Sequence, residues 1–226
     1  MHIGILQCGH FPTAEGYPEQ TYGDLYTRFL EGRGLTFQTW SVVDMQFPES
    51  IRSAEGWLIS GSKHGAYDYH PFIPPLEVFV RDAYAAQIPL VGICFGHQII
   101  AQALGGKVEK FEGGWSLGRQ VYRIEGRDVA LNAWHQDQVT IPPEQARTIG
   151  SNTLCEHAAL AYKGRAFSVQ GHPEFTDREV ELLLSVRRAA LSEDQAEEVR
   201  GNLGKPLSNA DLADRIANFF KEPAHV

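Results

Sequence analysis

The sequence predicts an α/β protein with a central, mostly parallel but mixed sheet flanked by helices, followed by a helical C-terminal tail. Three observations support this fold class. Strand-like apolar runs alternate with helix-like apolar periodicity through residues 2–104, which is the pattern of a doubly wound sheet. Short strands separated by turn residues follow from 107 to 170 and indicate an antiparallel part. The last third has helical periodicity, with segments typical of capping boxes at 176–179 and 208–211.

Each element follows from its local pattern, taken in chain order. Residues 2–8 form an apolar run expected to be a buried strand, and apolar residues recur at helical spacing from 22 to 30. Pro74 and Pro75 suit the first turn of a helix that we expect to end near Gln87. The other expected elements are strands at 35–43, 56–60 and 89–94, a helix at 96–104 closed by Gly105 and Gly106, and short strands at 121–124, 129–134 and 166–170.

Length, charge and cysteine content narrow the class of protein. The 226 residues suit one domain, which we divide into a core at 1–190 and a helical extension at 191–226 packed on it. A formal net charge of −8 without a basic cluster disfavours nucleic acid as a partner. The absence of a long apolar run or signal-like start predicts a soluble, cytoplasmic protein that makes no membrane contact. Three cysteines without paired spacing are expected to be free thiols.

A cysteine between two glycines marks the point where an expected strand turns into an expected helix. Side chains at the carboxyl end of such a strand line the crevice of the fold, so we expect the Cys94 thiol to be exposed there. Gly92 and Gly96 lack Cβ atoms and permit the sharp turn of a nucleophile elbow. The positive end of the following helix favours a thiolate. The alternative is that Cys94 is only a small buried hydrophobic residue.

A thiolate nucleophile needs a base and a group that orients this base. His172 and Glu174 stand two residues apart and project to the same side if the segment is extended. Pro173 between them disfavours helix at His172. A carboxylate beside an imidazole fixes its tautomer and supports its positive charge. His97, next to the elbow, has no carboxylate spaced to orient it, so we expect His172 to be the base.

Four motifs resemble those of the class I, triad-type glutamine amidotransferase family. "GICFGHQ" and "SVQGHPE", at 92–98 and 168–174, are similar to the family's Cys-x-Gly-x-Gln and His-Pro-Glu motifs. "LISGS" at 58–62 resembles its oxyanion strand, which ends in Ser-Gly-Gly, and "WHQDQV" at 134–139 resembles its Ser-His-x-Asp-x-Val segment. The motifs come in the family's order. The resemblance implies the family's flavodoxin-like fold, a mixed sheet flanked by helices.

The resemblance also implies a role for each matching residue. Two positions depart from the family pattern, because Ser62 replaces the usual second glycine and Gly171 replaces a bulky apolar residue. The implied roles are Cys94 as nucleophile, His172 as acid and base, and Glu174 as orienting carboxylate; backbone N–H groups of Phe95 and of the Gly61–Ser62 turn as oxyanion donors; and Gln98 with the backbone of Trp134 and His135 as the site for the glutamyl head group.

The expected reaction is cysteine-dependent hydrolysis of a γ-glutamyl amide, either glutamine or a γ-glutamyl peptide, through a γ-glutamyl thioester and without a cofactor. "QGHPEF" at 170–175 and the helical tail resemble stand-alone members similar to γ-glutamyl peptidases and to the glutaminase part of GMP synthases. The substrate is then a small molecule. One alternative is a glutaminase subunit that delivers ammonia to a separate synthetase partner.

Two alternatives from other classes stay open. Gly-x-Cys-x-Gly also occurs in α/β-hydrolases of the dienelactone hydrolase type, where Asp137 would serve as the acid and the substrate would be an ester. A binding protein that kept the fold without catalysis is the other alternative.

Several further residues receive a structural explanation. The loop that carries His64, Asp68 and His70 matches no common metal-ligand spacing, so we expect a polar loop over the site and no metal. We expect Cys8 to pack at the end of the first strand and Cys155 to lie near a loop, and we assign neither a role. Trp115 is a candidate for the wall of the pocket.

Overall fold

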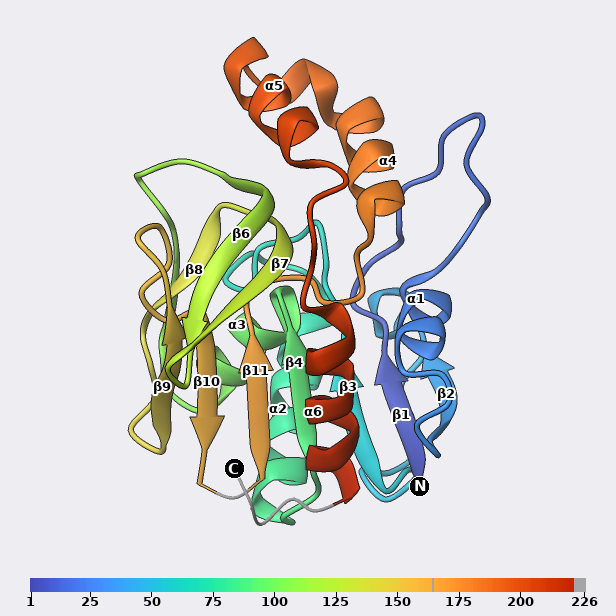
Figure 1. Ribbon diagram of the computed structural model, residues 1–226. Coiled ribbons are helices and arrows are strands. Elements are labelled where there is room, and N and C mark those ends of the chain that lie inside the picture. The colour runs from blue at the N-terminus through green and yellow to red at the C-terminus, as the bar shows by residue number, and fades with distance from the viewer. Residues whose placement is uncertain (164, 222–226) are drawn as a thin grey trace.

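The computed structural model describes residues 1–163 and 165–221, and it confirms the predicted mixed α/β architecture (Figure 1). A nine-stranded sheet has the order β2-β1-β3-β4-β11-β10-β9-β6-β7, and β5 pairs with β8 in a separate two-stranded sheet. The strands are β1 (His2–Leu6), β2 (Thr36–Trp40), β3 (Gly56–Ile59), β4 (Leu90–Ile93), β5 (Lys107–Lys110), β6 (Ser116–Ile124), β7 (Arg127–His135), β8 (Asp137–Ile141), β9 (Ala146–Ser151), β10 (Ala159–Tyr162) and β11 (Ala166–Val169). The α-helices are α1 (Tyr22–Phe29), α2 (Ile73–Ala85), α3 (Phe95–Ala103), α4 (Asp177–Arg187), α5 (Glu193–Asn202) and α6 (Asn209–Lys221), and the 3₁₀ turns are η1 (Val42–Asp44) and η2 (Arg188–Ala190).

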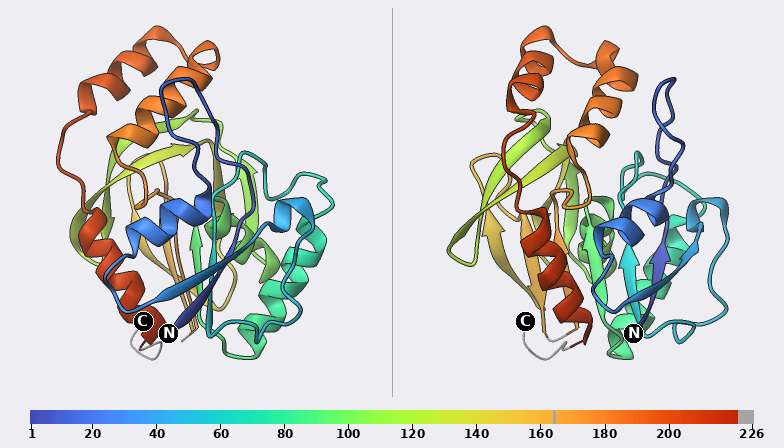
Figure 2. Two further views of the ribbon diagram at one scale, coloured as in Figure 1. Left: turned by 90° about the vertical axis from the view of Figure 1, so that its right-hand side faces the viewer. Right: turned by 45° about the vertical axis from the view of Figure 1, so that its right-hand side comes forward.

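The candidate site lies at one edge of the sheet, where its parallel strands end. Strands β2, β1, β3, β4 and β11 pair in parallel, whereas β10, β9, β6 and β7 continue the sheet in antiparallel pairing. The carboxyl ends of the parallel strands therefore meet at one edge, where ligands bind in open α/β sheets. Helices α4 and α5 stand beyond this edge, and all three views agree on their position (Figures 1 and 2).

The two faces of the sheet carry separate apolar cores, because successive side chains of a buried strand point to opposite faces. Leu58 belongs to the core shared with α1 and α6, and its neighbours Trp57 and Ile59 belong to the core shared with α2 and α3. Phe219 of α6 lies 6.1 Å from the ring of Phe167 in β11, so α6 packs directly on the central strands. Among the described residues, no helix has both the length and the apolar character needed to cross a bilayer.

A third, smaller apolar cluster joins the helical segment after residue 176 to the antiparallel half of the sheet. It consists of Leu117 from β6 and of Val180, Leu184, Leu191, Ala196 and Val199 from α4, α5 and the segment between them. The capping box expected at Thr176 and Glu179 is confirmed at the start of α4. Ser192 and Gln195 form another capping box at the start of α5. This cluster packs α5 and one side of α4 on β6, whereas Leu182 and Leu183 of α4 belong to the large core shared with α1 and α6.

Candidate active site

The turn between β4 and α3 holds Cys94 in a conformation that few non-glycine residues adopt. Its φ is 54° and its ψ is −104°, so the backbone is strained at this residue. A Cβ atom on Gly92 would lie 2.4 Å from the carbonyl oxygen of Gly96, and one on Gly96 would lie 2.1 Å from that of Ile59. The predicted need for glycine on both sides of Cys94 is confirmed.

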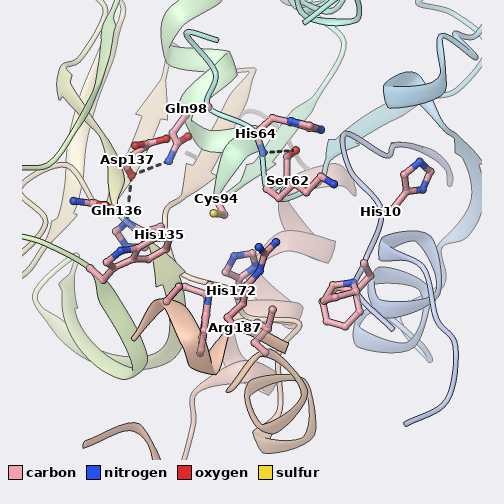
Figure 3. Close-up of a pocket in the computed structure, with 18 of the residues that line it drawn as sticks. His10, Ser62, His64, Cys94, Gln98, His135, Gln136, Asp137, His172 and Arg187 are labelled. Atoms are coloured by element: carbon pink, nitrogen blue, oxygen red, sulfur yellow. Dashed lines mark hydrogen bonds between the residues drawn. The ribbon is translucent and has the colours of Figure 1, made fainter. Parts of the chain in front are cut away.

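Cys94 is not exposed, and this expectation was wrong. Only 4% of its surface is accessible, yet the residue lines a cavity of about 550 Å³ at the carboxyl edge of the sheet (Figure 3). The loop after β3 and the helical segment after β11 also line the cavity and cover the strand ends. The prediction considered the strand alone, so it did not include the elements that close over it. We call Ser62, Cys94 and His172 the strand-end floor of the cavity.

His172 and Glu174 contact each other through a turn. The Nδ1 atom of His172 lies 2.7 Å from Oε1 of Glu174, and both side chains are buried. The N–H of Phe175 donates to the carbonyl of His172, so the segment is a turn and not the extended strand that we expected. The N–H of His172 donates to the carbonyl of Asn132 in β7 at 2.7 Å, and the Phe175 ring stacks on the imidazole at 3.9 Å.

The electrostatic surroundings of His172 favour its charged form. Burial opposes a charge on the ring, but the Glu174 carboxylate and then the Cys94 sulfur outweigh it, and the pKa of His172 is raised to about 10. Because Nδ1 faces Glu174, Nε2 is the nitrogen left for the cysteine. The ring therefore carries its positive charge next to the Cys94 sulfur.

Tyr26 of α1 contributes a contact that sequence reasoning missed. Its hydroxyl donates to Oε1 of Glu174 at 3.0 Å and accepts from the N–H of Gly61 at 3.3 Å. Burial and then the Glu174 carboxylate raise the pKa of Tyr26 well above its ordinary value, so the hydroxyl keeps its proton. One phenol therefore joins the carboxylate to the loop after β3. Tyr26 falls within the helical spacing of apolar residues at 22–30, but such a pattern carries no information about its hydroxyl.

The predicted oxyanion residues differ in their exposure to the cavity. Ser62 lines the cavity, and Phe95 is the first residue of α3, where N–H groups have no partner within the helix. Gly61 does not line the cavity, since its N–H is bound to Tyr26 and a Cβ there would lie 2.8 Å from the His172 ring. The hydroxyl of Ser62 donates to the carbonyl of Cys8, which fixes the turn.

The residues predicted to hold a glutamyl group share the cavity with Cys94. Gln98, Trp134 and His135 all line the cavity. The side-chain amide of Gln98 donates to the carbonyl of Asp137 at 2.8 Å, so it also holds the segment that follows β7. Burial, then the neighbouring His172, lowers the pKa of His135 to about 3, which keeps this ring neutral.

A wall from α4 and η2 was not predicted. Four of its side chains line the cavity, and together we call them the helical wall: Leu183, Arg187, Ala190 and Leu191. Arg28 of α1 pairs with the buried Glu179 at 3.1 Å and so ties α1 to the start of α4. Trp115 lines the cavity, as the sequence suggested. No motif marks the helical wall, and only its position in the fold reveals it.

His97 and Asp137, the alternatives to His172 as base and to Glu174 as acid, make other contacts. His97 is fully buried against Ser168, with 2.8 Å between Nδ1 and the hydroxyl, and it does not line the cavity. Asp137 accepts from the Tyr67 hydroxyl, whereas the carboxylate that contacts His172 is that of Glu174. At Gly171 a Cβ would lie 3.1 Å from both Leu131 and Tyr122, so these side chains occupy the space of the larger residue expected there.

The remaining sequence expectations concern a metal and two thiols. The loop with His64 and Asp68 lines the cavity, as expected for a polar loop over the site. Among residues 1–163 and 165–221, no three histidine, cysteine or acidic side chains come together as a metal site would require. Cys8 is buried just after β1, and Cys155 is buried in the loop between β9 and β10.

The fold and the site define a class of α/β proteins in which a cysteine, a histidine and a carboxylate converge at the carboxyl edge of the sheet. Residues 24–184 match the family model "Glutamine amidotransferase class-I". The chain belongs to this family. It is 30% identical to a glutamine amidotransferase-like protein of Schizosaccharomyces pombe, over 98% of this chain and 99% of that protein.

Other relatives within the family differ in what their names describe. Gamma-glutamyl peptidase 2 of Arabidopsis thaliana is 29% identical over 75% of this chain and 74% of that protein. GMP synthase [glutamine-hydrolyzing] of Thermus thermophilus is 30% identical over 68% of this chain but only 32% of that protein. A crystal structure of a glutamine amidotransferase from Methylobacillus flagellatus has a TM-score of 0.72, 22% identity and coverage of 97% and 91%, which supports the fold.

Proposed function

We propose that this protein hydrolyses γ-glutamyl amides through a Cys94 thioester, with His172 as acid and base and Glu174 as the carboxylate that orients it. The observation that carries the proposal is the buried pair of His172 and Glu174, 2.7 Å apart, which raises the pKa of the imidazole at a strained cysteine elbow. A site that stabilises an imidazolium next to a thiol is prepared for nucleophilic attack. The gamma-glutamyl peptidase relatives add independent support.

The proposed reaction has two halves. The Cys94 sulfur attacks the γ-carbonyl carbon, and the oxyanion of the tetrahedral intermediate accepts hydrogen bonds from the N–H groups of Phe95 and Ser62. We assign the second donor to Ser62 because the N–H of Gly61 is already bound to Tyr26. His172 then gives its proton to the departing amine as the C–N bond breaks. Water, deprotonated by His172, attacks the thioester and releases glutamate and the free thiol.

The proposed substrate is a γ-glutamyl peptide or conjugate, and the chain would act without a synthetase. A cavity of about 550 Å³ falls within the range of sites that hold drug-sized ligands and offers more room than the few atoms of a glutamine side chain need. The match to a GMP synthase favours a second candidate, in which the released amine is ammonia destined for a partner synthetase.

The test is an assay of the purified protein with glutamine and with γ-glutamyl dipeptides. We expect dipeptide hydrolysis by the isolated chain, and a loss of at least about 10⁴-fold in Cys94→Ala. Circular dichroism of the variant serves as the folding control. Hydrolysis that survives in Cys94→Ala would refute the mechanism. Activity that is negligible in the isolated chain but appears with a co-purifying synthetase would favour ammonia supply.

A further inference from the structure

The cavity has two sides, and the proposed chemistry assigns a different part of the substrate to each. In Figure 3, Gln98, His135 and Asp137 lie on one side of Cys94, and His172 and Arg187 lie on the other. Because His172 must protonate the departing nitrogen, the leaving group has to lie on the His172 side. The glutamyl part is then left for the side that carries Gln98. Arg187 is therefore on the side that receives the leaving group.

Arg187 lines the same cavity as His172 and lies on the same side of Cys94 (Figure 3). Tyr22 lines the cavity together with Arg187, and a Cβ on Gly61 would lie 3.3 Å from the Tyr22 hydroxyl and 2.8 Å from the His172 ring. The Tyr22 ring also packs on Phe11, whose ring contacts Phe175. These three rings form an aromatic surface in the cavity that also holds His172 and Arg187. A group attached to the departing nitrogen would pass along this surface toward the guanidinium.

The charge of Arg187 has no partner within the described part of the chain. It forms neither an ion pair nor a side-chain hydrogen bond there, whereas the next residue, Arg188, pairs with Glu193. The two carboxylates that line the cavity have other contacts, Asp137 with the Tyr67 hydroxyl and Asp68 with the N–H of Gly65. Lys63 and Lys110, also without ion pairs among the described residues, add positive charge to the cavity. In a chain of net charge −8, this cavity offers unpaired cations.

We infer that Arg187 binds a carboxylate on the leaving group, so that the preferred substrates are γ-glutamyl amino acids or peptides with a free carboxylate on the amine side. A guanidinium binds a carboxylate through two parallel N–H groups, which adds geometric selectivity to charge. Glutamine has no such carboxylate, because its leaving group is ammonia. This inference rests on the proposed γ-glutamyl hydrolysis and specifies its substrate class.

The sharpest test compares two substrates that differ only in this charge. γ-Glutamylglycine carries the carboxylate, and γ-glutamylglycinamide replaces it with a neutral amide of nearly the same size. We expect the wild-type protein to favour the first by about tenfold in kcat/KM, the lower end for a hydrogen bond to a charged group because Arg187 is exposed. The preference should shrink as salt is added.

Arg187→Gln should raise the KM for γ-glutamylglycine by about tenfold, leave its kcat unchanged, and leave kcat/KM for the glycinamide and for glutamine unaffected. Arg178→Gln is the matched control, because Arg178 is an exposed arginine of the same helix that does not line the cavity. An Arg187→Gln protein that still prefers the carboxylate would overturn the inference, as would a wild-type protein without the preference.

The test separates this inference from the proposed function. If hydrolysis fails for all three substrates, the proposed function fails, and the inference is then decided by binding. Calorimetry of the two dipeptides with Cys94→Ala, and with Cys94→Ala combined with Arg187→Gln, measures the same preference without turnover. Tighter binding of γ-glutamylglycine that disappears in the double variant supports the role of Arg187. Equal binding of both dipeptides to Cys94→Ala overturns it.

Discussion

The strand-end floor and the helical wall of the cavity are built in different ways. The floor is fixed by the main chain, through the positive φ of Cys94, glycines without room for a Cβ, and the turn that joins His172 to Glu174. The wall is fixed by side chains, with Leu191 in the small apolar cluster of α4, α5 and β6 and Leu183 in the large core shared with α1 and α6. We expect the floor to tolerate almost no change, whereas the exposed wall residues Arg187 and Ala190 can vary without disturbing the sheet.

Loss of the imidazole should have the largest effect on the floor. We expect His172→Ala to lower kcat by about 10⁴-fold or more, and Glu174→Gln to lower it by about 10² to 10³-fold, since the glutamine leaves the ring present but without charge support. Steady-state kinetics with a γ-glutamyl dipeptide measure both. Full activity in Glu174→Gln would place the orienting acid elsewhere, and Asp137→Asn would be the next variant to assay.

The raised pKa of His172 also predicts how stability depends on pH. Its folded-state pKa of about 10 lies above the ordinary value of 6.5, so the folded protein binds this proton more tightly than the unfolded chain does. The stabilisation is complete below pH 6.5 and is lost as the pH rises toward 10. Urea unfolding at pH 6.5 and at pH 10 measures this loss. The free energy of unfolding should fall less between these two pH values in Glu174→Gln than in the wild-type protein, because the variant lacks the charge that raises the pKa of His172.

Replacing a glycine with alanine should change stability in opposite directions next to the floor and in helix α5 near the wall. Gly96→Ala would place a Cβ 2.1 Å from the Ile59 carbonyl oxygen, and we expect it to destabilise the protein by about 3 kcal/mol. Gly201→Ala in α5 meets no atom within 4 Å and should stabilise the protein by about 0.5 kcal/mol through helix propensity. Urea unfolding measures both. Equal effects at the two positions would contradict the proposed difference between the regions.

Tyr26→Phe removes one hydroxyl from the support of the floor. We expect about a tenfold decrease in kcat with little change in KM, because Glu174 loses a hydrogen bond while the cavity surface keeps its shape. Tyr162→Phe is the control, since Tyr162 is also buried and outside the cavity lining but makes no hydrogen bond to Glu174. A Tyr26 variant whose kinetics match those of this control would mean that the hydroxyl only stabilises the fold.

The strain at Cys94 predicts a small difference in stability between glycine and alanine at this position, in the opposite direction from the usual one. Glycine is ordinarily less stabilising than alanine in regular structure, but it adopts positive φ without strain. We expect Cys94→Gly to be more stable than Cys94→Ala by about 1 kcal/mol, with both variants inactive. Thermal unfolding of the two proteins side by side makes the comparison, and a more stable alanine variant would show that the elbow relaxes when the thiol is removed.

The same two regions mark how far the sequence alone could predict the molecule. The elbow, the pairing of His172 with Glu174 and the order of strands and helices through β4 leave local signals in glycine, proline and apolar spacing, and these were predicted. The turn that joins His172 to Glu174 was not, because the segment was expected to be extended. The buried position of Cys94 was not, because burial depends on segments distant in the sequence. Tyr26 and Arg187 lie in ordinary amphipathic helices, where a hydroxyl or a guanidinium acquires a role only through its neighbours in space.

The strand order also determines when the floor can first exist during biosynthesis. Cys94 follows β4, whereas His172 and Glu174 follow β11, which inserts beside β4 about 80 residues later in the chain. Closing such a long loop is a slow, non-local step. At ordinary rates of about 5–20 residues per second, the nascent chain would carry Cys94 without its base for several seconds. An incomplete chain would therefore hold an unactivated thiol, and reactivity would appear only with the completed central sheet.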